Sequence, residues 1–167
     1  MSVLKEVNDI VYKVIGACME VHKTLGPGLS VDFYKKAMEI ELGEKGLNFD
    51  IDRPYDVKFK DIVLGENVIH FVIQDKVIIE IKAQDELKDS EIQYTLRNLG
   101  YAEANIGVLV NFGGTKIQYR RILPSRQSNN GNNQHPNQIT NQPIKKEALR
   151  PLGYRDVSRT REGNPVI

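Results

Sequence analysis

VIHFVIQDKVIIEIK, residues 68–82, is the stretch that decides the fold, because two apolar runs flank three polar residues. The polar residues, 74–76, are typical of a β-hairpin turn between two buried strands. A turn centred on Asp75 gives an antiparallel register in which His70 lies directly opposite Glu80. The stretch therefore predicts a pair of hydrogen-bonded strands.

One face of this hairpin gathers polar side chains that can carry chemistry. Lys82 lies two residues beyond Glu80, so both side chains point to one side of the sheet, the side of His70. Ile79 and Ile81 point the other way, into the core. A carboxylate can hold a divalent cation, and a lysine can orient the attacking water and offset phosphate charge. Chance also produces E-x-K spacing, so a plain surface salt bridge is the alternative.

The segments around the hairpin alternate between helical and strand patterns. Apolar residues recur at helical spacing up to Leu25, and the Gly-Pro-Gly stretch at 26–28 then ends the first helix. Residues 106–110 form a short apolar run, which is typical of a buried strand. The full set of predicted elements comprises helices over residues 4–25, 31–45 and 90–101 and strands over residues 49–59, 68–73, 77–81, 106–110 and 117–122. This order predicts an α/β (α+β) fold, with a mixed β-sheet flanked by helices.

The composition changes sharply after Pro124. Residues 125–143 contain ten Asn or Gln and one aliphatic residue, too few apolar groups to offset the entropy of folding. Residues 144–167 are polar and basic. We therefore predict one folded domain over residues 1–124, followed by a disordered Asn/Gln-rich linker and basic tail over residues 125–167.

Composition and charge narrow the classes of function. The chain has 167 residues and a formal net charge of +1, but residues 125–167 have a net charge of +4, which leaves residues 1–124 at −3. An acidic domain argues against an extensive phosphate-binding surface, although a local basic patch remains compatible. A single cysteine excludes an internal disulfide, and we find neither a membrane-spanning apolar run nor a secretory signal. These features predict a cytoplasmic protein.

Three separated blocks resemble one family of proteins. They are VIGACMEVHKTLGPGLSVDFYKKAMEIEL (14–42), DIVLGENVIHFVIQDKVIIEIKA (61–83) and IGVLVNFG (106–113). In order and spacing they are similar to the GxxExxY family, a branch of the PD-(D/E)XK nuclease superfamily. The resemblance covers about residues 4–122 and implies a restriction-endonuclease-like core with a metal site on the central hairpin. It also implies hydrolysis of phosphodiester bonds with Mg²⁺ and a nucleic acid partner, with DNA favoured over RNA.

The resemblance assigns roles to particular residues. Position by position, the matches are Glu80 and Lys82 for the E-x-K pair, Glu20 and His22 for the E-x-H of the first helix, and Gly28 and Tyr34 for the outer residues of GxxExxY. In the family pattern Glu80 binds the metal, Lys82 positions water, and Glu20 joins the metal site. A helical glutamine after E-x-K corresponds to Gln93, or to the position of Tyr94 if no gap is allowed.

Two of the matched residues on the first helix also have purely structural interpretations. His22 lies near the C-terminus of the predicted helix, where a cation favourably meets the helix dipole. Glu20 is either a solvated residue on the outer face of the helix or the carboxylate partner of Glu80. Both alternatives stay open at this point.

Two departures from the family pattern bear on the metal site. The central Glu of GxxExxY is Val31 in this chain, and the Asp of the first hairpin strand is His70. Asp32 does not replace the missing Glu, because one residue along a helix turns a side chain by about 100°. Mg²⁺ prefers carboxylate oxygen, whereas a neutral imidazole suits Mn²⁺ or Zn²⁺ better.

The sequence therefore leads to a hypothesis with one alternative. We expect a PD-(D/E)XK nuclease-fold protein with a weakened or lost metal site. If it is active, it is a divalent-metal-dependent nuclease, with Glu80 and either His70 or Glu20 on the metal. The alternative is a non-catalytic module of the same fold that binds nucleic acid or a protein.

Overall fold

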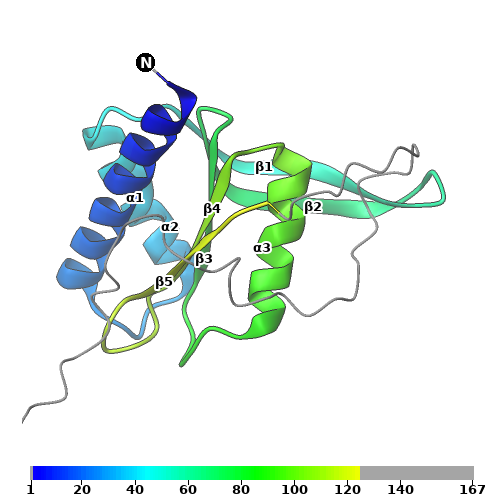
Figure 1. The fold of residues 1–167 in the computed structure, drawn as a ribbon. Coiled ribbons are helices and arrows are strands. Elements are labelled where there is room, and N and C mark those ends of the chain that lie inside the picture. Colours follow the sequence, from blue (N-terminus) through cyan, green and yellow to red (C-terminus); the bar gives the residue numbers. More distant parts are fainter. Residues whose placement is uncertain (1, 125–167) are drawn as a thin grey trace, which may run out of the picture.

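The computed structural model describes residues 2–124, which fold as a five-stranded sheet between helices (Figure 1). The elements are α1 (Val3–Leu25), α2 (Val31–Glu44), β1 (Phe49–Phe59), β2 (Ile62–Ile73), β3 (Val77–Lys82), α3 (Asp89–Ala102), β4 (Ile106–Asn111) and β5 (Gln118–Ile122). All of the predicted helices and strands are present. The predicted linker and tail, residues 125–167, lie outside the described residues.

The strands form one mixed sheet in the order β1-β2-β3-β4-β5. The β3–β4 pair is parallel and the other three pairs are antiparallel. Helix α3 makes the crossover that a parallel pair requires. All residues of β4 are buried, as its apolar sequence predicts, and β5 lies at an edge of the sheet. The fold class predicted from the sequence is confirmed.

Two hydrophobic cores lie on the two faces of the sheet. Helices α1 and α2 cover one face and α3 covers the other (Figure 1). Along β3, Ile79 and Ile81 belong to the core under α1 and α2, whereas Ile78 belongs to the core under α3. Because side chains alternate along a strand, Glu80 and Lys82 project toward the α3 side.

The turn between β2 and β3 sets the register of the central hairpin. Gln74 and Asp75 have φ values of +50° and +54°, a left-handed conformation, within the three-residue turn between the paired Ile73 and Val77. The register is the predicted one, with Phe71 opposite Ile79. Pairing ends at these two residues, so β2 and β3 part just beyond them.

Strand β2 begins at Ile62, well before the predicted start at Val68. Its first half pairs with β1 in a two-stranded arm whose turn, at Lys60 and Asp61, has positive φ. Phe59 and Ile62 lie opposite each other at the end of the arm, and both are exposed. Because this half of β2 has no buried face, the hydrophobic pattern did not reveal it, and pairing with β1 makes it a strand.

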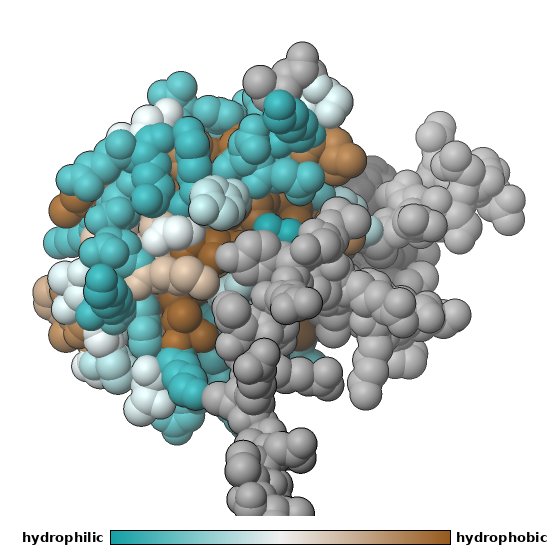
Figure 2. All heavy atoms as spheres, turned by 60° about the vertical axis from the view of Figure 1, so that its left-hand side comes forward, coloured by the Kyte–Doolittle hydropathy of each residue, from teal (hydrophilic) through white to brown (hydrophobic). Residues whose placement is uncertain are grey.

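Figure 2 shows the side of the molecule on which α1 lies, where hydrophilic side chains surround patches of apolar ones. Tyr12 on α1 and Phe33 on α2 are among the large apolar side chains that these helices expose. Within residues 2–124, no helix has both the length and the apolar character needed to cross a bilayer.

Candidate functional site

His70 and Glu80 lie side by side where β2 and β3 part. The Nδ1 atom of His70 is 3.4 Å from Oε2 of Glu80. The backbone N–H of Ile81 donates a hydrogen bond of 3.0 Å to the same Nδ1 atom. The imidazole therefore supplies an acceptor where the backbone ladder between the two strands has ended.

Glu80 is fully buried, which is rare for a carboxyl group. Its Oε1 accepts a hydrogen bond of 2.8 Å from Nδ2 of Asn98 on α3. Its Oε2 has no hydrogen-bond partner within the described residues. Burial raises the pKa of Glu80 to about 7, against the opposing effects of the Asn98 hydrogen bond and the charge of Lys82. A buried carboxyl group with one unsatisfied oxygen marks a candidate functional site.

The electrostatic surroundings keep His70 neutral. Burial lowers the pKa of His70 to about 4, and the positive charge of Lys35 acts in the same direction, while Asp52 opposes it. Because Nδ1 accepts the hydrogen bond from Ile81, the ring proton is assigned to Nε2. At neutral pH, the imidazole of His70 therefore places no positive charge beside the carboxyl group of Glu80.

Lys82 ends β3 beside an aromatic ring of α3. Its Nζ atom lies 5.3 Å from the centroid of the Tyr94 ring, within reach of a cation–π interaction. The Tyr94 hydroxyl donates a hydrogen bond of 3.1 Å to Oδ1 of Asn67. The side chain of Gln93, the predicted counterpart of the family glutamine, makes no hydrogen bond within the described residues. The structure thus places Tyr94 beside the lysine. Gln93 precedes it on α3, and its side chain points about 100° away from that of Tyr94.

A chain of polar side chains holds Asn98 in place. The Tyr55 hydroxyl donates to Oδ1 of Asn98, and Nδ2 of Asn67 donates a hydrogen bond of 2.9 Å to the Tyr55 hydroxyl. Burial raises the pKa of Tyr55 to about 12, so its hydroxyl keeps the proton that it donates. With its oxygen occupied by Tyr55, the Asn98 amide presents its NH₂ group to Glu80.

Two charged residues that the sequence did not point to join this cluster. Lys35 on α2 forms an ion pair of 2.5 Å between its Nζ and Oδ1 of Asp52 on β1. Asp52 lies opposite His70, between two paired positions of the β1–β2 ladder, and has φ of +50°. The charges of Lys35 and Asp52 both act on His70. Helical spacing could have pointed to Lys35, because it lies one turn after Val31 and on the same helix face.

The two residues at the position of the missing family Glu point in different directions. Val31 packs against the core under α1 and α2. Asp32 is exposed, and its negative charge acts on His70, although less than that of Asp52. Asp32 therefore adds negative charge near the hairpin site.

The structure does not bring Glu20 or His22 to the hairpin site. Glu20 is exposed on α1, where its Oε1 accepts a hydrogen bond of 3.5 Å from the Thr24 hydroxyl. Glu20 points outward because the sheet-facing side of α1 is taken by apolar residues such as Val21. Nε2 of His22 lies 2.9 Å from the carbonyl oxygen of Gly114, so His22 ties α1 to the loop after β4.

Tyr34 is a fully buried residue that ties the start of α2 to the loop before it. Its hydroxyl donates a hydrogen bond of 2.6 Å to the carbonyl of Gly26 and accepts one of 3.2 Å from the N–H of Leu29. Its ring stacks on Phe112, with the centroids 4.7 Å apart. These contacts give Tyr34 a structural role.

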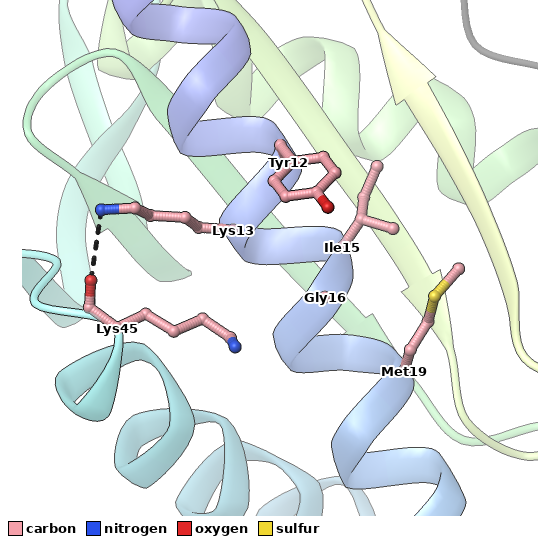
Figure 3. Close-up of a pocket in the computed structure, with 6 residues that line it drawn as sticks. All are labelled: Tyr12, Lys13, Ile15, Gly16, Met19 and Lys45. Atoms are coloured by element: carbon pink, nitrogen blue, oxygen red, sulfur yellow. Dashed lines mark hydrogen bonds between the residues drawn. The ribbon is translucent and has the colours of Figure 1, made fainter.

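A cavity of about 340 Å³ lies away from the hairpin, on α1 beside the C-terminal end of α2 (Figure 3). It is lined by Tyr12, Lys13, Ile15, Gly16, Met19 and Lys45. Nζ of Lys13 donates a hydrogen bond of 3.3 Å to the carbonyl oxygen of Lys45. The lining contains no carboxylate and no hairpin residue, so this cavity does not contain the chemistry described above.

Comparison with known protein families assigns the chain to a superfamily. The family described as the PD-(D/E)XK nuclease superfamily matches residues 8–122, which include every residue of the hairpin site. The chain belongs to this superfamily. The match confirms the superfamily that the resemblance implied, while membership of the GxxExxY branch stays a prediction. A search of curated proteins and a search of solved structures found no match.

PD-(D/E)XK nucleases generally use divalent metal ions. The side chains near Glu80 can be compared with the ligands that such an ion requires. In the described part of the chain, no three His, Cys, Asp or Glu side chains lie close enough together to hold a metal ion. Glu80 supplies one carboxyl group, and Nδ1 of His70 already accepts a backbone N–H. Lys82 and Lys35 add positive charge. This set of residues does not fit Mg²⁺, which requires several oxygen ligands.

Proposed function

We propose that this PD-(D/E)XK nuclease-fold protein binds the phosphate backbone of nucleic acid at the hairpin site and does not hydrolyse it with Mg²⁺. The observation that carries the proposal is the surroundings of Glu80. This carboxyl group is fully buried between Asn98 and His70, without a second carboxylate in contact with it among the described residues. DNA is favoured over RNA as the partner.

The loss of hydrolysis follows from the charge around Glu80. An Asp at position 70 would supply a second negative charge, whereas His70 is neutral and its Nδ1 atom is occupied. The positive charges of Lys82 and Lys35 both act on Glu80. A divalent cation at this place would have one carboxyl group beside it and would be repelled by the charges of both lysines, an unfavourable balance.

Binding of a phosphate is compatible with the same surroundings. Ammonium groups donate to the non-bridging oxygens of a phosphodiester, and such contacts position a nucleic acid without reading its sequence. Because residues 1–124 have a net charge of −3, the contact is local rather than spread over the surface. Residues 125–167, with a net charge of +4, add longer-range attraction.

A cleavage assay with matched variants tests the absence of hydrolysis. The full-length protein is incubated with single- and double-stranded DNA and with RNA, in Mg²⁺, Mn²⁺ or Zn²⁺, the last two because His70 offers nitrogen. We expect no more cleavage than with Glu80→Ala. Metal-dependent cleavage that both Glu80→Ala and Lys82→Ala abolish would refute the proposal and identify an active nuclease.

A binding assay tests the positive half of the proposal. Fluorescence anisotropy in EDTA follows the binding of labelled DNA and RNA to the full-length chain. We expect Lys82→Gln to weaken binding, whereas Lys58→Gln, on the exposed arm, leaves it unchanged within about twofold. If no nucleic acid binds, the proposal fails and a protein-binding role becomes the interpretation of this fold.

A further inference from the structure

The two-stranded arm formed by β1 and β2 extends past α3 (Figure 1). At the base of the arm Tyr55 packs on α3, where its ring stacks on that of Tyr101 with the centroids 4.0 Å apart. Alternation along the strands, with Leu64 as the extra residue of a bulge, gives the other residues that share this face. This arm face consists of Tyr55, Val57, Phe59, Ile62, Gly65 and Asn67.

Direct contacts connect the arm face to the hairpin site. Nζ of Lys82 lies 5.3 Å from the centroid of the Tyr94 ring, and the Tyr94 hydroxyl donates a hydrogen bond of 3.1 Å to Oδ1 of Asn67. Nδ2 of Asn67 donates one of 2.9 Å to the Tyr55 hydroxyl. Phe59 lies four residues beyond Tyr55, about 13 Å along an extended strand. A ligand that reaches from Lys82 to the end of the arm face is therefore an extended chain.

The outer end of the arm face is apolar and open to solvent. Phe59 is 59% exposed and Ile62 is 66% exposed. The two residues lie opposite each other, so they form a patch rather than single exposed side chains. Nζ of Lys60 lies 5.5 Å from the centroid of the Phe59 ring and adds a positive charge to this patch.

The acidic residues on the strands of the arm lie on the opposite face. Asp56 and Glu66 are paired in the register, and alternation points both away from the arm face. Asp61 lies in the turn at the tip, and the arm face itself contains no acidic residue. A partner on the arm face therefore meets aromatic and apolar side chains beside a lysine. This surface is complementary to a negatively charged chain that carries flat rings.

We propose that the arm face binds unpaired bases of single-stranded nucleic acid, with one base stacked on the ring of Phe59. The inference rests on the proposed function and names the form of nucleic acid that the site takes. Bases of any identity stack on aromatic side chains, and a neighbouring lysine attracts the backbone. In a duplex the bases stack on one another, so only an unpaired strand presents a base to Phe59.

The experiment uses the full-length chain and three labelled probes in EDTA, with binding followed by fluorescence anisotropy. The probes are a thymidine oligonucleotide, the same strand in a duplex, and an abasic strand with the same backbone. We expect Phe59→Ala to weaken binding of the thymidine strand at least about fivefold, and of the other two probes by less than about twofold. Val63→Ala is the matched control, because Val63 is exposed on the opposite face, where it pairs with Lys58.

Two further variants separate stacking from a general apolar contact. Phe59→Leu keeps an apolar side chain but removes the ring, so we expect it to bind the thymidine strand as weakly as Phe59→Ala does. Phe59→Trp keeps a ring and should retain the affinity of the natural chain. Because Phe59 is exposed, these variants should keep the fold, which circular dichroism checks. Full affinity in Phe59→Leu would contradict stacking.

The outcomes separate this inference from the proposed function. If Lys82→Gln weakens binding but Phe59→Ala behaves as Val63→Ala does, the inference is wrong and the proposed function stands. The inference also fails if Phe59→Ala weakens binding of the abasic strand as much as that of the thymidine strand. If Phe59→Ala instead separates a dimer in sedimentation and leaves DNA binding unchanged, the arm face is an interface between copies. If the natural chain binds no nucleic acid, both are wrong.

Discussion

The carboxyl group of Glu80 and the imidazole of His70 are 3.4 Å apart, and burial shifts their pKa values in opposite directions, to about 7 and about 4. Both shifts favour the neutral form. Between pH 4.5 and 6.5, the ordinary values of the two groups, the folded chain holds one proton on Glu80 and the unfolded chain holds one on His70. The pH dependences that the two groups give to stability therefore cancel in this range, and each appears separately in single variants.

Glu80→Gln stabilises the protein at neutral and higher pH. The folded chain keeps a proton on Glu80 up to a pKa of about 7, while the unfolded chain releases it near 4.5, so stability falls as pH rises through this interval. A glutamine side chain does not titrate, so the variant gains up to about 3 kcal/mol above the interval and little below it. Urea unfolding across pH checks this, with the exposed Glu39→Gln as control. A gain that is the same at every pH would contradict a raised pKa of Glu80.

His70→Asn should make the protein more stable at acid pH. The pKa of His70 is lowered to about 4 in the folded chain, so the stability that His70 allows at neutral pH is lost as pH falls from 6.5 to about 4. Asn keeps an acceptor for the N–H of Ile81 but does not titrate. We expect the variant to resist acid unfolding better than the natural chain, as circular dichroism across pH can measure. An unchanged acid transition would contradict the assigned protonation.

Restoring the two family carboxylates should give faster hydrolysis when Lys35 is also removed. Val31→Glu with His70→Asp returns two negative charges to the site, but Lys35 still opposes a divalent cation. We expect Mg²⁺-dependent cleavage of DNA to rise by roughly tenfold when Lys35→Gln is added to this pair. Adding Lys36→Gln instead is the control. Equal rates for the two triple variants would show that Lys35 does not interfere with the metal.

Tyr34→Phe should lower stability rather than binding. The change removes a hydrogen bond to the carbonyl of Gly26 and one from the N–H of Leu29, at a cost of about 1–3 kcal/mol. The exposed Tyr12→Phe should cost little. Thermal unfolding measures the difference. If Tyr34→Phe instead abolishes nucleic acid binding at unchanged stability, Tyr34 belongs to the site and not to the scaffold.

Features of the fold that depend on neighbouring residues could be predicted from the sequence. The polar break at 74–76 sets the register of the central hairpin, and that register brings His70 and Glu80 together. Helix α1 ends at Leu25 because Gly26, with φ of +67°, does not continue it. These features depend on residues close together in the chain.

The parts of the site that could not be predicted depend on packing between distant elements. The ion pair of Lys35 with Asp52 joins α2 to β1, and nothing local signals the left-handed backbone at Asp52. The choice between Gln93 and Tyr94 depends on how α3 is rotated against the sheet. The outward position of Glu20 likewise follows from the packing of α1.

The most direct test of the central claim is a single titration of Mg²⁺ into the full-length protein bound to labelled DNA, with affinity and DNA length read from the same samples. We expect that binding is already present in EDTA, does not tighten with Mg²⁺, and leaves the DNA intact. Binding that appears only with Mg²⁺, or DNA cleavage that Glu80→Ala removes, would contradict it.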